Sequence, residues 1–295
     1  MRKTVLLMAA LAVGLGALWA QGMVSGRHVR AAEGGSRMPQ AARDTSGFTA
    51  LSTETRTLEV GDVKVTWIQD RAATQSASLF PGADPKLVDS LGLRGGIPSS
   101  MSVFLVESKG MRILFDTGLG AKDSRLLPLL SLMGLTPADI GFIYLTHLHG
   151  DHIGGLMDSG RAVFPAAQVF VAKQEFRGWM RMPAEKKAQV EKMAKAYRLN
   201  LHFFDFGDYL PGGVKTIDAS GHTPGHTAFR VGDLLIVGDI LHGAALQLAD
   251  LDLCPTYDMN PAEARAARKR MLQLARTDSL VMAGMHLPAP GFMKF

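Results

Sequence analysis

The sequence contains one cysteine, Cys254, so no disulfide bond can form within the chain. The folded state must then depend on an apolar core and on any metal that the side chains bind. No motif typical of a nucleophilic cysteine surrounds Cys254. We therefore interpret this residue as a small buried apolar side chain.

The sequence also lacks a long run of one charge. The net charge is +5, but the densest charged stretch, residues 185–195, mixes lysines with Glu185 and Glu191 at helical spacing. Such a mixed stretch is typical of a solvated helix face. The charge pattern therefore predicts no nucleic-acid partner.

The N-terminus has the pattern of an export signal. Arg2 and Lys3 precede an apolar run, Thr4–Trp19, that is short for a membrane span. No cysteine follows the run, which excludes a lipoprotein anchor. We expect a periplasmic or secreted protein with no stable membrane insertion after cleavage; the alternative is an uncleaved anchor. The predicted divisions are a signal peptide at 1–26, a flexible leader at 27–52 and one domain at 53–295.

Apolar periodicity predicts that strands and helices alternate along this domain. Short apolar or alternating runs bounded by Gly and Pro indicate strands, and longer runs with a 3.6-residue period indicate helices. The Gly- and Pro-containing stretch Ser76–Ser100 is predicted to be a long loop that covers a site. The order of elements predicts an α/β fold with sheets inside helical layers. The predicted strands are Thr57–Val60, Val63–Gln69, Ser102–Glu107, Arg112–Phe115, Phe142–Leu145, Gln168–Ala172, Leu201–Phe204, Val214–Asp218, Thr227–Val231, Leu234–Val237 and Ser279–Ala283, and the predicted helices are Leu126–Leu135, Pro137–Ile140, Lys173–Met180, Pro183–Tyr197 and Pro261–Arg276.

Three histidines and one aspartate lie within six residues, directly after the strand predicted at Phe142–Leu145. In an extended backbone side chains alternate, so the first two histidines point the same way and reach one cation. The chain then turns at a glycine, and the aspartate and the third histidine face a second cation beside the first. Imidazole and carboxylate are the usual ligands of zinc and related ions. The four residues are His147, His149, Asp151 and His152.

Three further candidate residues each lie just past the end of a different predicted strand. Loops at strand ends are where a rigid scaffold presents functional groups. His202, by contrast, lies within a predicted strand, and we interpret it as a core or surface residue. The three candidates are His222 in a turn bounded by Gly and Pro, Asp239 after Gly238, and His286 shortly after Gly284.

Together these motifs resemble the metallo-β-lactamase superfamily. The shared features are H-x-H-x-D-H from His147, G-H-T-P-G-H from Gly221, a strand ending in Gly-Asp at Asp239, and a final histidine at His286. The resemblance runs from about Thr57 to His286. It implies a four-layer αβ/βα sandwich.

A closer resemblance lies in two segments, Gly238–Gln247 and Ala283–Gly291. They look like the exported, methyl parathion hydrolase-like and lactonase-like subgroup of the superfamily. One difference is His242, because several lactonases carry a tyrosine at this position. This subgroup implies a metal-dependent hydrolase of esters, lactones or phosphotriesters.

The resemblance implies two divalent metal ions per chain. Zinc is the first choice, and manganese and iron are alternatives because they use similar ligands. Asp116 would support the metal motif without binding metal, and His226 would have a structural role. The implied metal ligands are His147, His149 and His222 for one ion and Asp151, His152 and His286 for the other, with Asp239 bridging the two.

The implied reaction is attack by a hydroxide that the ions generate from water. Asp151 would also hydrogen-bond this water and protonate the leaving group, and His242 would face the substrate or support the metal site, with a packing role as the alternative. Apolar residues in Ser76–Ser100 and Leu287–Phe295 indicate a small, uncharged and partly apolar substrate. The sequence leaves the oligomeric state open, a homodimer included.

Three other functions share parts of this pattern. Export favours a β-lactamase. However, the antibiotic-cleaving members of the superfamily generally lack a bridging carboxylate at the position that Asp239 occupies here. A glyoxalase II-like thioester hydrolase shares the whole ligand set, yet no basic cluster is placed to hold glutathione carboxylates. A non-catalytic metal-binding protein is disfavoured because structural zinc sites are closed by four ligands, often cysteines.

Overall fold

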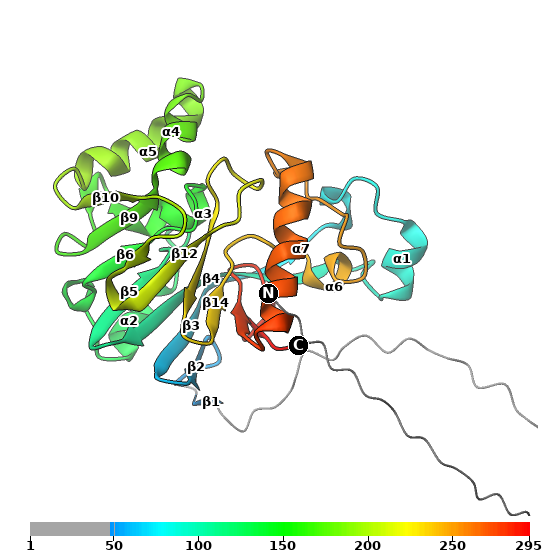
Figure 1. Ribbon diagram of the computed structural model, residues 1–295, viewed down its shortest axis with the longest axis horizontal. Coiled ribbons are helices and arrows are strands. Elements are labelled where there is room, and N and C mark those ends of the chain that lie inside the picture. Colours follow the sequence, from blue (N-terminus) through cyan, green and yellow to red (C-terminus); the bar gives the residue numbers. More distant parts are fainter. Residues whose placement is uncertain (1–47, 50) are drawn as a thin grey trace, which may run out of the picture. The chain divides into compact units, whose positions relative to one another are not determined.

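Two β-sheets organise the part of the chain that the computed structural model describes, residues 48–49 and 51–295 (Figure 1). The predicted signal peptide, residues 1–26, lies outside the described residues. So does most of the predicted leader, residues 27–52, although strand β1 (Phe48–Thr49) falls within it and pairs with β2. Over the described ranges, the chain forms no helix that is both long and apolar enough to cross a membrane.

The first sheet has eight strands in the order β1-β2-β3-β4-β5-β6-β9-β10. Its first five strands pair antiparallel, and β5, β6, β9 and β10 pair in parallel. The parallel strands end at the same edge, so the loops that follow them lie close together. Besides β1, the strands are β2 (Thr55–Val60), β3 (Val63–Gln75), β4 (Ile97–Ser108), β5 (Met111–Phe115), β6 (Phe142–Tyr144), β9 (Gln168–Ala172) and β10 (Leu201–Phe204).

The second sheet has six strands in the order β11-β12-β13-β14-β15-β16. Only β14 and β15 pair in parallel. A separate two-stranded sheet joins β7 (Met157–Asp158) to β8 (Arg161–Ala162). The strands of the second sheet are β11 (Tyr209–Leu210), β12 (Val214–Asp218), β13 (Thr227–Val231), β14 (Leu234–Ile236), β15 (Val281–Ala283) and β16 (Phe292–Met293).

Helices cover the outer face of each sheet. On the first sheet lie α2 (Leu126–Leu132), α4 (Lys173–Met180) and α5 (Ala184–Ala196), and on the second lies α7 (Pro261–Thr277). Asn260 caps α7 by accepting a hydrogen bond from the Glu263 backbone, and Pro261 occupies its first turn. The shorter helices are α1 (Pro85–Ser90), α3 (Gly150–Ile153) and α6 (Ala244–Gln247), and the 3₁₀ turns are Ala77–Leu79, Pro137–Asp139, Gly154–Leu156 and Pro211–Gly213.

The apolar core confirms the predicted four-layer αβ/βα arrangement. Side chains alternate along β4, so Phe104 and Val106 face the second sheet while Val103 and Leu105 face the helices. In β14, Leu235 likewise packs toward α7 and its neighbours pack between the sheets. One core therefore lies between the sheets, and one lies under each helical layer.

The prediction of a long loop at Ser76–Ser100 is only partly correct. The strand pair β3–β4 continues to Gln75 and Ile97 past an irregularity at Asp70, and the remaining residues include α1. The Asp70 carboxylate turns away to accept hydrogen bonds from three backbone N–H groups and from the Ser124 hydroxyl, at 2.9 to 3.0 Å. These contacts hold the start of α2, and the bulge that they require interrupts the alternation on which the strand prediction depended.

Cys254 also differs from its prediction. It is only partly buried, and its thiol donates to the Pro261 carbonyl at 3.3 Å. The guanidinium of Arg268 lies 3.9 Å from its sulfur. Cys254 therefore contacts polar groups and does not belong to the apolar core.

Candidate metal centre

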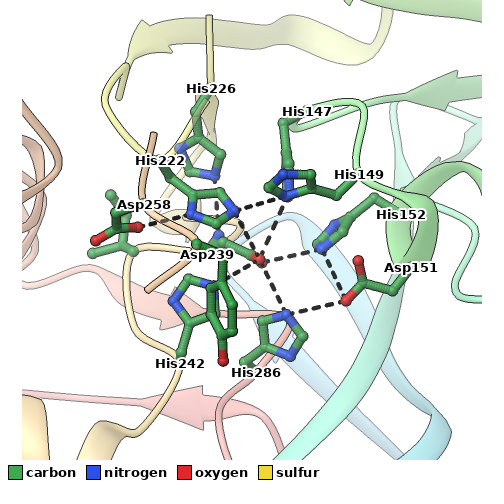
Figure 2. A network of polar contacts seen from close by, with 12 residues as sticks. His147, His149, Asp151, His152, His222, His226, Asp239, His242, Asp258 and His286 are labelled. Carbon is green, nitrogen blue, oxygen red and sulfur yellow. Dashed lines mark hydrogen bonds and ion pairs between the residues drawn. The ribbon is translucent and has the colours of Figure 1, made fainter. Parts of the chain in front are cut away.

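The predicted ligands converge at one edge of the two sheets (Figure 2). After β6, Leu148 packs into the helix-side core, while His147 and His149 on either side of it both point to the cluster. Helix α3 then turns the chain and adds two more side chains. The loops after β12, β14 and β15 supply the others. The side chains brought together are His147, His149, Asp151, His152, His222, Asp239 and His286.

One group of donor atoms belongs to His147, His149, His222 and Asp239, all within 4.8 Å of one another. The Nδ1 atom of His149 lies 2.9 Å from Nε2 of His147 and 2.9 Å from Nε2 of His222. The carboxylate oxygen Oδ2 of Asp239 lies 3.4 Å from Nε2 of His222. Three imidazole nitrogens and a carboxylate oxygen around one point form a donor set suited to zinc.

A second group consists of Asp151, His152 and His286. Nε2 of His286 lies 3.4 Å from the Asp151 carboxylate and 3.1 Å from that of Asp239. The other oxygen of Asp239 lies 3.2 Å from Nε2 of His152. Asp239 therefore lies between the two groups and contacts both, as a bridging ligand would.

Two buried atoms of these groups, Nε2 of His152 and Oδ1 of Asp239, lie 3.2 Å from each other but form no hydrogen bond. An unsatisfied buried polar atom is costly, and folded proteins rarely leave one without a partner such as water or an ion. The side chains of His152 and Asp239 point toward each other inside the cluster (Figure 2). The site therefore fits a pair of cations.

Burial lowers the pKa of His147 and His222 well below the ordinary value, and lowers that of His149 to about 4. These rings are neutral and can offer a lone pair. Burial acts the same way on His152 and His286, but the Asp239 and Asp151 carboxylates outweigh it and raise the pKa of His286 to about 10. The carboxylates thus create a negative potential that protons or metal ions must compensate.

The Nδ1 atoms of three rings are held from outside the cluster. Asp116, as the resemblance implies, accepts from His152 at 2.7 Å and also binds the Thr146 backbone N–H and hydroxyl. The Ser100 carbonyl accepts from His286 at 2.7 Å. Asp258 accepts from His222 at 2.8 Å. Each contact fixes a tautomer in which Nε2 is free to face a metal.

Sequence reasoning missed Asp258, which belongs to a buried ion pair. The Arg268 guanidinium lies 3.4 Å from its carboxylate and donates to the carbonyls of Ile240 and Leu251. Arg268 is 1% exposed, so this pair links α7 to His222 without contact with water. Asp258 precedes the cap of α7 by two residues, a position that carries no sequence signal of its own.

Sequence reasoning also missed Glu175, a fully buried carboxylate in α4. Its Oε1 accepts from the Leu148 backbone and the Trp179 indole, at 3.0 and 2.7 Å. Its Oε2 accepts from the Thr223 hydroxyl and the Gly225 backbone, at 2.8 and 2.7 Å. Burial raises the pKa of this carboxyl, and the four hydrogen bonds oppose the rise. Glu175 therefore joins the loop of His147 and His149 to the loop of His222.

His242 lies inside the cluster. Its Nε2 is 3.1 Å from the Asp239 carboxylate, and its ring stacks on that of His286 with 5.0 Å between centroids. Its Nδ1 is buried without a hydrogen-bond partner. The geometry places His242 against Asp239 and His286, and its catalytic role stays a prediction.

His226 lies behind Asp239 and uses both ring nitrogens on the backbone. Its Nδ1 donates to the Ala219 carbonyl at 3.1 Å, and its Nε2 accepts from the Asp239 N–H at 3.0 Å. Gly238 makes this approach possible, because its φ is +55° and a Cβ there would lie 2.4 Å from Nε2 of His226. Burial lowers the pKa of His226 to about 3, which keeps the ring neutral.

We expect His226→Ala to lower the free energy of unfolding by about 2–4 kcal/mol, because it removes a buried ring and two hydrogen bonds. The metal count should stay at that of the wild type, since no free nitrogen is lost. Urea unfolding of the metal-free protein and metal analysis of the loaded protein measure the two effects. His202→Ala, on edge strand β10, is the matched control. Loss of an ion from the His226 variant would contradict the structural role.

Known proteins share both the fold and parts of the sequence. The sequence pattern of the family described as "Metallo-beta-lactamase superfamily" matches residues 96–286. Ribonuclease Z of Nanoarchaeum equitans is 30% identical over 119 residues, which are 38% of this chain and 33% of that protein. The N-acyl homoserine lactonase AttM of Azorhizobium caulinodans is 30% identical over 106 residues, 34% of this chain and 38% of that protein. The chain thus spans less than half the length of the relatives that it matches.

Solved structures match over most of their length. The hydrolase AbOPH, described as in the beta lactamase superfamily, has a TM-score of 0.74 and 28% identity, covering 82% of this chain and 92% of that one. AidC, described as a dizinc quorum-quenching lactonase, has a TM-score of 0.74 and 25% identity, covering 83% of this chain and 92% of that one. With the matched family pattern and the His/Asp groups, these likenesses show that the chain belongs to the metallo-beta-lactamase superfamily.

Proposed function

We propose that the protein hydrolyses small esters, lactones or phosphotriesters at a pair of divalent cations, with zinc as the first choice. The observation that carries this proposal is the position of Asp239, whose two oxygens contact both donor groups. Bound there, two cations would supply a water of lowered pKa as the nucleophile and a Lewis acid for the substrate oxygen.

The proposed ligand roles follow the two donor groups. His147, His149 and His222 would hold one ion, Asp151, His152 and His286 the other, and Asp239 both. Neutral imidazoles suit this role because an ion needs their lone pairs. The contacts of Asp116, Asp258 and the Ser100 carbonyl with these rings would keep the donors aimed inward.

Asp151 is the best placed of the ligands to handle a proton. Its side chain is 23% exposed, whereas that of Asp239 is 2% exposed. A carboxylate at the edge of the site can orient the attacking water and later deliver a proton to the leaving group. His242, in contact with Asp239 at 3.1 Å, would fix the orientation of that carboxylate or contact the substrate.

The likeness to a lactonase solved with N-hexanoyl-L-homoserine supports a small-molecule substrate with an apolar part. Export to the periplasm or beyond is part of the proposal and rests on Arg2, Lys3 and the apolar run that follows. N-terminal sequencing of the mature protein tests this part, and the original N-terminus on all recovered protein would contradict it.

Assays of the purified protein with and without chelator test the proposed activity. We expect turnover of a chromogenic ester, a lactone or a phosphotriester, loss of this turnover on metal removal, and recovery on adding zinc. A β-lactam and a glutathione thioester in the same panel distinguish the alternative enzymes. Two bound ions without turnover of any substrate would instead favour a metal-binding protein.

A further inference from the structure

A cavity of about 340 Å³ lies between helix α1 and the adjoining ends of β3 and β4. This volume falls in the range of pockets that bind small molecules. Part of the stretch that was predicted as a loop builds one wall of it. The lining residues are Thr74, Gln75, Ser76, Ala77, Val88, Leu93, Arg94, Gly95 and Gly96.

Gln75 connects this cavity to the metal centre. Its side-chain oxygen accepts a hydrogen bond from the Tyr257 hydroxyl at 3.0 Å. The Tyr257 ring lies 4.9 Å from the ring of His242, whose Nε2 is 3.1 Å from the Asp239 carboxylate. A continuous row of side chains therefore leads from the cavity to the bridging carboxylate, and both Gln75 and Tyr257 are partly exposed.

The side chains that line the cavity determine which kind of ligand it can bind. Ala77, Val88 and Leu93 give the cavity apolar walls. Arg94 is its one charged lining residue, and the guanidinium forms an ion pair with Asp89 of α1. Thr74, Gln75 and Ser76 add polar side chains to the lining. Because the charge of Arg94 is already compensated, the cavity suits an uncharged chain with polar and apolar parts rather than an anion.

Two glycines leave space in the wall, for different reasons. Gly96 has a φ of +117°, and a Cβ there would lie 2.2 Å from a methyl carbon of Thr74, so the backbone requires glycine. Gly95 has no such constraint, because a Cβ there would meet no heavy atom within 4 Å. Gly95 lines the cavity and is exposed, so a larger side chain can be added at its rim without a clash at Cβ.

We propose that this cavity binds the non-reacting arm of the substrate, an uncharged acyl or alkyl chain that passes Tyr257 and Gln75 on its way from the metal centre. The inference rests on the proposed function and adds a chain-length preference to it. Burial, with the charges of Asp239 and Asp151, raises the pKa of Tyr257 to about 12, so its hydroxyl stays protonated and can donate to a carbonyl oxygen of the substrate in place of Gln75.

Filling the cavity from Gly95 tests the proposal. We expect Gly95→Trp to lower the ratio of kcat/KM for 4-nitrophenyl octanoate to that for 4-nitrophenyl acetate by about tenfold, mainly through KM. Gly95→Leu should lower the ratio less. Lys86→Trp places the same bulk on an exposed position of α1 outside the cavity and should leave the ratio at the wild-type value.

A folded Gly95→Trp protein with a ratio within twofold of the wild type would overturn the inference. If the wild type hydrolyses neither of these esters, a binding measurement tests the cavity independently of the proposed function. The uncharged, unreactive amide N-octylacetamide should then raise the thermal midpoint of the wild type and of Lys86→Trp but not that of Gly95→Trp. Equal shifts in all three proteins, or none, would reject the cavity as a chain-binding site.

Discussion

His149→Ala is expected to reduce hydrolysis by about a thousandfold or more and to lower the metal content below two ions per chain. Nδ1 of His149 lies 2.9 Å from the donor atoms of both His147 and His222, so its loss opens the first donor group. The lost activity follows because a metal ion supplies several kcal/mol of charge stabilisation and lowers the pKa of its bound water. Ester turnover and elemental analysis of the same preparation measure both effects.

The fold should tolerate this substitution, because His149 is only partly buried and faces the cluster rather than the core. The thermal midpoint of the metal-free variant should therefore stay close to that of the metal-free wild type. His202→Ala removes a half-buried histidine on β10, stacked on Phe170 outside the cluster, and should retain activity and metal. Full activity in His149→Ala would refute the assignment of the metal centre.

The ligand positions were predictable from the sequence because their signals are local. His147 and His149 are two positions apart, shortly after a short apolar strand, and their side chains point to the same cluster. His222, Asp239 and His286 follow strand ends, and the topology brings those ends to one edge. Local spacing and a position after a strand end were therefore sufficient to identify these residues.

The supporting residues were not predictable because their roles depend on contacts across the fold. Glu175 lies 27 positions from Leu148 and 50 from Gly225, the residues whose backbones it holds. In the sequence it is one acidic residue of a short helix, and only burial distinguishes it from solvated neighbours such as Glu185. Asp70 is similar, since a bulge turns its carboxylate from the sheet to the start of α2.

The hydrogen bonds of Glu175 lead to a strong prediction for the isosteric variant Glu175→Gln. Each carboxylate oxygen of Glu175 accepts from one backbone N–H and from one side chain. The amide nitrogen of glutamine must replace one of these oxygens. It would then face the N–H of either Leu148 or Gly225, donor against donor, at a fully buried position. The Thr223 hydroxyl can rotate so that it accepts a hydrogen bond from the new amide nitrogen. A backbone N–H cannot change from donor to acceptor in this way.

We expect Glu175→Gln to lower the free energy of unfolding by about 2–4 kcal/mol, the cost of unsatisfied buried donors beside a lost charged acceptor. Metal affinity should fall as well, because the two tethered loops carry His147, His149 and His222, and binding then has to order them. Urea unfolding of the metal-free protein and zinc titration measure the two losses. Glu185→Gln removes an exposed carboxylate from α5 and should change neither. Wild-type stability in Glu175→Gln would show that the four contacts do not hold the loops, and the metal centre would then depend on its ligands and their direct supports alone.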